Sequence, residues 1–209
     1  MSALYPWLVP TYHQIAQTFS EGVGHHAILI KADSGLGAEL LFGALARRIM
    51  CANPQGNEAC GQCHSCHLMA ARSHPDYHLL QSIEGKDIGV DQVREINEIA
   101  QHAQQNGNKV VYVQGAQRLT EAAANAVLKT LEEPRPNTYF LLQAESSANL
   151  LATIYSRCQV WNLPVPNREM AQQWLQNTVE SGSNAVLFED ITTALAMSSG
   201  RPLSALEVL

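Results

Sequence analysis

The sequence predicts an α/β fold in which helices cover a parallel β-sheet. Residues 109–113 and 138–143 are short, mostly apolar runs, as expected of strands that are buried on both faces. Residues 120–131, between them, are rich in Ala and Leu, and Pro134 and Pro136 end the helix that this composition indicates. Two buried strands joined by a helix form a βαβ unit, so both strands belong to one parallel sheet.

The bulk composition describes a globular chain that is large enough to bury a core. Its 209 residues are 46% hydrophobic and 15% charged, and this length suits one larger and one small domain. The formal net charge is −6, which argues against a broad contact with nucleic acid. Because no apolar run approaches a membrane span and the N-terminus lacks a signal-peptide layout, the sequence predicts a cytoplasmic protein without a membrane contact.

The first 51 residues predict a helix, a strand, a glycine turn and a second helix. Residues 10–21 form an amphipathic pattern, and residues 26–32 read as a buried strand. The turn over residues 33–37 is followed by a periodic apolar pattern over residues 38–51. Strand, glycine turn and helix in this order are the context that a phosphate-binding loop requires.

The turn nevertheless departs from the phosphate-binding motif G-x-x-x-x-G-K-[ST]. Ala38 stands where the lysine would reach the phosphates, and Glu39 stands where a hydroxyl would hold Mg²⁺. Gly35 and Gly37 can still present backbone N–H groups, but a carboxylate at the start of the helix repels phosphate. We therefore expect a turn that is kept for folding, without bound ATP.

The second nucleotide motif is also incomplete. After the strand over residues 110–113, a Walker B motif would place an Asp that holds the metal and a Glu that activates water. The chain has Gln114 and Gly115 there, and neither offers a carboxylate. The sequence thus predicts that this chain does not hydrolyse ATP.

Between the two motifs lies a cluster of cysteines. Four of the five cysteines follow the spacing C-x₈-C-x₂-C-x₂-C in a polar loop over residues 51–66: Cys51, Cys60, Cys63 and Cys66. Four thiolates at this spacing suit tetrahedral Zn²⁺, and a site with four protein ligands is structural because no position is open for substrate. The alternatives are free thiols, a redox pair, or replacement of one cysteine by His64 or His67.

The rest of the chain predicts further strands and helices and a domain boundary. A strand over residues 77–81 and a helix over residues 90–104 precede the central βαβ unit. Pro164 and Pro166 interrupt regular structure, so we expect one domain over residues 1–165 and a small helical domain over residues 166–209. Its expected helices begin at the N-cap Asn167 and cover residues 167–177, 184–197 and 202–209.

Two segments resemble clamp-loader subunits of the AAA+ family. They are residues 123–134 (AANAVLKTLEEP) and the tripeptide Ser156-Arg157-Cys158. The resemblance implies a RecA-like AAA+ sheet with a cysteine-rich zinc module, followed by a small helical lid. It also implies a C-terminal collar domain, which we do not find in these 209 residues. Where the resemblance implies the sensor-1 residue, the chain reads Gln143-Ala144-Glu145, and at the implied sensor-2 position it has Leu203, with Arg201 two places earlier.

The resemblance gives Arg157 a function. Clamp loaders place an arginine finger in this tripeptide, which implies that Arg157 acts in trans on ATP bound by a neighbouring subunit. From the residue alone, a surface or ion-paired arginine is the alternative interpretation. Cys158 is expected to be a small buried side chain rather than a zinc ligand.

The resemblance implies a non-hydrolysing subunit of a replicative clamp loader. Its implied partners are ATPase subunits and a delta subunit in a hetero-oligomeric ring, and through them the sliding clamp and primed DNA. Such subunits are grouped with DNA-directed DNA polymerase. Two alternatives remain at this stage: an active ATPase of the same fold, and a zinc-dependent module that binds nucleic acid.

Overall fold

A five-stranded parallel sheet forms the centre of the protein. The computed structural model describes residues 4–102, 104–105, 107–180 and 188–209. The strands lie in the order β2-β3-β4-β1-β5, and every pair is parallel. Their bounds are β1 Ala27–Lys31, β2 Tyr77–Gln81, β3 Lys109–Gln114, β4 Thr138–Ala144 and β5 Gln159–Asn162. The predicted α/β class and the central βαβ unit are confirmed.

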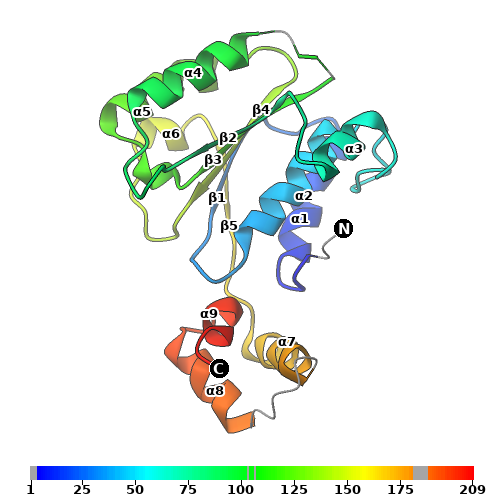
Figure 1. The fold of residues 1–209 in the computed structure, drawn as a ribbon, viewed down its shortest axis with the longest axis vertical. Helices are drawn as coiled ribbons and strands as arrows, with labels where there is room; N and C mark the ends of the chain where they lie inside the picture. The colour runs from blue at the N-terminus through cyan, green and yellow to red at the C-terminus, as the bar shows by residue number, and fades with distance from the viewer. Residues whose placement is uncertain (1–3, 103, 106, 181–187) are drawn as a thin grey trace.

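Helices cover both faces of the sheet (Figure 1). The helices α1, α2 and α3 lie on one face, and α4, α5 and α6 lie on the other. The bounds of these elements, with the short 3₁₀ helix η1, are α1 Val9–Ser20, α2 Ala38–Met50, α3 His64–Ala70, α4 Val90–Gln101, η1 Ala116–Arg118, α5 Glu121–Glu132 and α6 Ala152–Tyr155. None of the helices in the described ranges has both the length and the apolar character needed to cross a bilayer.

Alternating side chains of the strands supply two separate cores. Ile28 and Ile30 of β1 belong to the core beneath α1 and α2, whereas Leu29 belongs to the core beneath α4 and α5. All three are buried, as the unbroken apolar run of β1 predicts for a central strand. Burying one such side chain stabilises the fold by about 1.5–3 kcal/mol.

The C-terminal helices form a third, smaller core. They are α7 Arg168–Glu180, α8 Phe188–Met197 and α9 Pro202–Leu206, and they lie at one end of the sheet (Figure 1). Asn167 caps α7 as predicted, because its Oδ1 accepts the backbone N–H of Met170 at 2.8 Å. On α7, Trp174 meets the rings of Tyr5 and Trp7 edge to face, which joins this helix to the N-terminal segment.

The sequence-based boundaries differ from the structure in a few places. The helix α3 begins inside the segment that the sequence predicted to be a loop, and α4 ends at Gln101 rather than at residue 104. The predicted start of α8 at residue 184 lies outside the described residues. Helix ends fray, so a shift of a few residues at a terminus has little structural meaning, whereas α3 is a separate element.

Candidate functional site

The glycine turn after β1 leads directly into α2 and has positive φ angles at two glycines. Gly35 and Gly37 have φ angles of +80° and +70°, in the left-handed region that favours glycine. Gly37 is the N-cap of α2, so the predicted strand–turn–helix order is present. Ala38 and Glu39 occupy the first turn of α2.

Other parts of the chain pack directly against this turn. A Cβ atom placed on Gly35 would lie 2.1 Å from the Ser204 Oγ, and one on Gly37 would lie 2.5 Å from the Tyr5 ring. The backbone N–H of Leu203 donates to the Gly35 carbonyl at 3.1 Å, and the Arg201 Nη1 donates weakly to the Ser34 Oγ at 3.4 Å. The start of α9 and the N-terminal segment therefore cover the turn.

The Glu39 carboxylate has a partner within the chain. Gln143, in β4, donates through Nε2 to the Glu39 Oε1 at 3.3 Å, and its own Oε1 accepts the hydroxyl of Tyr112 from β3. Burial raises the pKa of Tyr112, and the charge of Glu39 adds to this effect, so the hydroxyl stays protonated as a donor. Gln143 thus belongs to an internal polar network with Glu39 and Tyr112.

The four predicted zinc ligands come together. The Sγ atoms of the four cysteines all lie within 4.8 Å of one another (Cys51, Cys60, Cys63 and Cys66). The Sγ of Cys51 is 3.5 Å from that of Cys60 and 3.9 Å from that of Cys63. Zn–S bonds of about 2.3 Å at tetrahedral angles give S···S separations of about 3.8 Å. The cluster therefore has the size and the donor set of a structural zinc site.

Backbone N–H groups point at two of these sulfurs. The N–H of Cys60 donates to the Cys51 Sγ at 3.3 Å, and the N–H of Cys63 donates to the Cys60 Sγ at 3.4 Å. Burial opposes ionisation of Cys63, but backbone hydrogen bonds from Cys66 and Ala52, together with the thiols of Cys66 and Cys60, outweigh it and lower its pKa to about 6. Burial raises the pKa of Cys66 to about 12. A cation among the sulfurs would balance thiolates that the backbone only partly stabilises.

Contacts that do not involve sulfur dock the cysteine loop against α1 and α2. The buried Arg48 donates through Nε to the Gly56 carbonyl at 3.0 Å and through Nη2 to the Ser20 Oγ at 3.1 Å. The Tyr12 hydroxyl donates to the Asn57 carbonyl at 2.7 Å. Burial, together with the nearby Glu58 carboxylate, raises the pKa of Tyr12 to about 12. The loop is thereby fixed to the larger core.

The short helix α3 is held by His74, a residue of the segment that precedes β2. The His74 Nδ1 accepts the backbone N–H of Asp76 at 3.1 Å, so the neutral ring carries its proton on Nε2, which lies 3.2 Å from the Ser65 Oγ. Burial lowers the pKa of His74, which favours this neutral form. His74 is therefore a structural link between α3 and β2.

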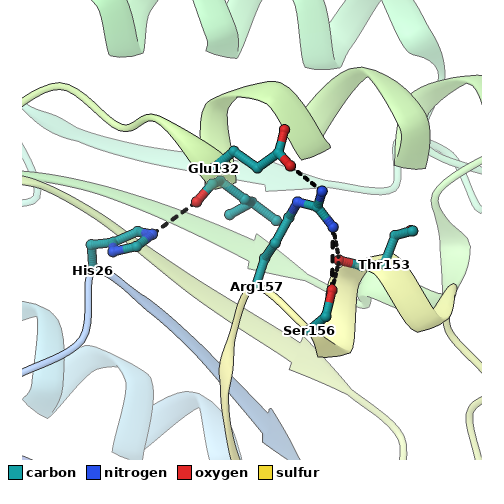
Figure 2. A network of polar contacts seen from close by, with 6 residues as sticks. His26, Glu132, Thr153, Ser156 and Arg157 are labelled. Atoms are coloured by element: carbon teal, nitrogen blue, oxygen red, sulfur yellow. Dashed lines mark hydrogen bonds and ion pairs between the residues drawn. The ribbon is translucent and has the colours of Figure 1, made fainter.

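Arg157 lies on the corner between α6 and β5, as predicted, and Figure 2 shows its contacts. Its Nη2 forms an ion pair with the Glu132 carboxylate at the end of α5. Its Nη1 donates to the Thr153 carbonyl at 2.9 Å and to the Ser156 Oγ at 3.2 Å. The side chain of Arg157 is 24% exposed and that of Glu132 is 49% exposed. The guanidinium is thus paired within the chain but remains at the surface.

The Arg157 Nε has a different environment. It is buried, and it has no hydrogen-bond partner in the part of the chain that the structure describes. Nearby, the His26 Nε2 lies 2.8 Å from the Leu131 carbonyl, which connects the end of α5 to the segment before β1 (Figure 2). Cys158 is half-buried beside Arg157 and lies outside the cysteine cluster. Burial raises the pKa of Cys158 to about 12, in agreement with an apolar role.

Glu132 is the residue of this site that sequence reasoning missed. It lies within the quoted run of residues 123–134 but 25 positions before Arg157, and nothing in the local pattern pairs the two. The sequence did leave an ion-paired arginine open as an alternative interpretation of Arg157. The structure contains this ion pair, and the role of Arg157 in trans remains a prediction.

Known proteins match this chain in sequence and in fold. It is 75% identical to the DNA polymerase III subunit delta' of Haemophilus influenzae over 100% of its own length and 62% of that protein. It is 45% identical to the subunit of the same name from Escherichia coli, covering 97% of this chain and 60% of that protein. The chain thus spans less than two thirds of the length of these curated relatives.

A solved structure supports the fold. A DNA polymerase III gamma subunit-related protein from Thermotoga maritima superimposes with a TM-score of 0.58 and 20% identity, over 93% of this chain and 69% of that one. The described residues therefore have the expected AAA+ (RecA-like) fold, with a cysteine group that could hold a metal ion. A family profile described as "DNA polymerase III, delta subunit" matches residues 9–167. The chain therefore belongs to this DNA polymerase III delta subunit family.

Proposed function

We propose that this chain is a clamp-loader subunit that does not hydrolyse ATP and that supplies Arg157 to ATP bound by a neighbouring ATPase subunit. The observation that carries the proposal is a partly exposed guanidinium on the corner between α6 and β5. An arginine is permanently charged and presents planar donors, which suits the charge that develops on a transferred phosphoryl group. The step it serves would be the loading of a sliding clamp onto primed DNA.

The covered glycine turn supports the non-hydrolysing part of the proposal. Ala38 and Glu39 lack the cation and the hydroxyl that phosphoryl transfer uses, and Gln114 lacks the carboxylate that would hold Mg²⁺. Tyr5 and Ser204 pack against the turn itself. Both features disfavour the alternative of an active ATPase of the same fold.

The names of the relatives support the proposed partners. Proteins that match this chain are named as subunits of DNA polymerase III. We propose that its partners are ATPase subunits and a delta subunit in a hetero-oligomeric ring in the cytoplasm. In this arrangement residues 1–165 are the AAA+ domain and residues 166–209 are the lid. The cysteine cluster holds Zn²⁺ as a structural ion, since four thiolates leave no open position for chemistry.

The test uses Arg157→Ala in the full-length protein, assembled with the ATPase subunits. At the neighbour's site we expect hydrolysis to fall by about 10³-fold, the lower end of the range for arginine fingers in GTPases. Arg157→Lys should restore little, because an ammonium group lacks the planar fork. Single-turnover hydrolysis and clamp loading on primed DNA measure the effect.

The matched control is Arg94→Ala. Arg94 is an exposed arginine of α4 whose one ion pair among the described residues is with Asp91, at 3.1 Å, so its removal should leave both rates unchanged. Full DNA-stimulated hydrolysis and loading by the Arg157→Ala complex would exclude the finger.

A further inference from the structure

The hydrogen bonds of Arg157 leave few donors for a second molecule. A guanidinium has five N–H donors, two on each Nη atom and one on Nε. Both Nη1 donors are used within the chain, by the Thr153 carbonyl and the Ser156 Oγ. One Nη2 donor goes to Glu132, and the Nε donor is buried without a partner in the described residues. A single Nη2 donor therefore remains for an approaching ligand.

One donor is too few for the way arginine binds phosphate. Strong arginine–phosphate contacts are bidentate, with two parallel N–H donors facing two oxygens. Each parallel pair of a guanidinium joins one Nη2 donor to a donor of Nη1 or Nε, and in this chain Nη2 contacts Glu132, Nη1 contacts Thr153 and Ser156, and Nε is buried (Figure 2). A bidentate contact with a phosphate thus requires Arg157 to give up contacts within the chain, and the ion pair with Glu132 is the one of these contacts that neutralises its charge.

We propose that Glu132 is an intrachain competitor for Arg157, which withholds the guanidinium from a neighbour's phosphate until the closed subunit interface displaces it. This inference rests on the proposed function of Arg157. Glu132 acts here as a positioning residue, because it touches the arginine and not the reacting atoms.

The exposure of the pair makes the exchange feasible. Glu132 is half-exposed and Arg157 is 24% exposed, and ion pairs that reach solvent hold their partners weakly. A terminal phosphate carries more charge than one carboxylate and accepts two donors at once, so it competes well when it is close. The Nη1 contact to the Thr153 carbonyl at 2.9 Å can persist during the exchange and keep the guanidinium on the corner, while the longer contact to the Ser156 Oγ at 3.2 Å gives way to the phosphate.

The position of Glu132 explains why the chain holds the arginine when no phosphate is near. Glu132 is the last residue of α5, where the helix dipole disfavours a negative charge, and Glu133 follows it. Arg157 brings a positive charge to this helix end. When no phosphate is near, the ion pair with Arg157 therefore stabilises the Glu132 carboxylate at a helix end that disfavours negative charge.

The experiment is Glu132→Gln in the full-length protein within the assembled clamp-loader complex. The amide keeps the size of the side chain and removes its charge. We expect ATP hydrolysis in the absence of clamp and DNA to rise about twofold to fivefold, as expected when one weak ion pair no longer competes. The rate stimulated by clamp and primed DNA should not change, because the finger is already released in that state.

Two further variants isolate the effect. Glu133→Gln makes the same charge change one residue away, where the structure shows no contact between the side chain and Arg157 among the described residues, and should leave the basal rate unchanged. In the double variant Glu132→Gln/Arg157→Ala the gain should vanish, because the competitor acts only through the arginine.

The outcomes separate this inference from the proposed function. If Arg157→Ala alone has no effect, the finger itself is excluded. If Arg157→Ala is impaired but Glu132→Gln leaves the basal rate unchanged, only the competition is overturned. A fall of both basal and stimulated rates in Glu132→Gln would also overturn it, since Glu132 would then support the working position of Arg157.

Discussion

At the scale of single residues, Lys109 shows how a buried charge can complete a helix. The first residue of β3 is 2% exposed, and its Nζ donates to the carbonyls of Ile99 at 2.6 Å and His102 at 3.0 Å. These carbonyls lie at the end of α4, where a helix leaves acceptors without intrahelical partners. Burial lowers the pKa of Lys109, and the nearby Asp76 opposes this shift. Lys109 thereby ties the end of α4 to the sheet.

We predict that Lys109→Met destabilises the protein by about 1–3 kcal/mol, because it leaves buried carbonyls without a donor. The free energy of unfolding from urea titration measures this loss. Lys86→Met is the control: the Lys86 side chain is 80% exposed and, within the described ranges, pairs with Glu84 alone, so its change should stay within about 0.5 kcal/mol. Equal midpoints for the two variants would contradict the role of Lys109.

At the scale of elements, the cysteine module has two independent attachments. Arg48 and Tyr12 hold the loop over residues 52–59 against α1 and α2 without using any sulfur. The four thiols then join the end of α2, this loop and α3. Since the two cores of the sheet are built from other residues, loss of metal should affect the module first and the sheet little.

Metal analysis of cysteine variants tests this arrangement. We predict about one zinc ion per chain in the purified protein and in Cys158→Ser, and a strong loss of zinc in Cys63→Ser. After zinc removal, limited trypsin digestion should cut after the exposed Arg72, beyond α3, while the sheet resists. Zinc loss in Cys158→Ser, or a metal-free wild-type chain, would contradict the assignment.

At the scale of the whole molecule, local patterns predicted the elements better than their contacts. Strand β2 has the predicted bounds because its apolar run is local to residues 77–81. The helix α3 was missed because it has seven residues and begins between two metal-ligand positions, where spacing suggests a loop. The pairing of Glu132 with Arg157 and the contact of Leu203 with Gly35 join distant segments, and no periodicity encodes such contacts.

The packing of Tyr5 and the start of α9 against the glycine turn leads to a prediction about ATP binding by the whole chain. If the loss of the lysine and the hydroxyl alone prevented ATP binding, Ala38→Lys/Glu39→Thr would supply both groups and restore binding. We expect this double variant to bind ATP more weakly than about 1 mM, because Tyr5 and the start of α9 pack where phosphate would approach the turn. Fluorescence anisotropy with a labelled ATP analogue measures the affinity.

Removing the side chains that pack against the glycine turn provides the complementary measurement of ATP affinity. Adding Tyr5→Ala and Ser204→Ala to the double variant removes the Tyr5 ring beside Gly37 and the hydroxyl group beside Gly35. ATP affinity should then rise above that of Ala38→Lys/Glu39→Thr, since the backbone donors of the turn become accessible. Micromolar binding by the double variant without trimming would mean that the lost side chains, and not the packing of the whole chain, keep ATP out.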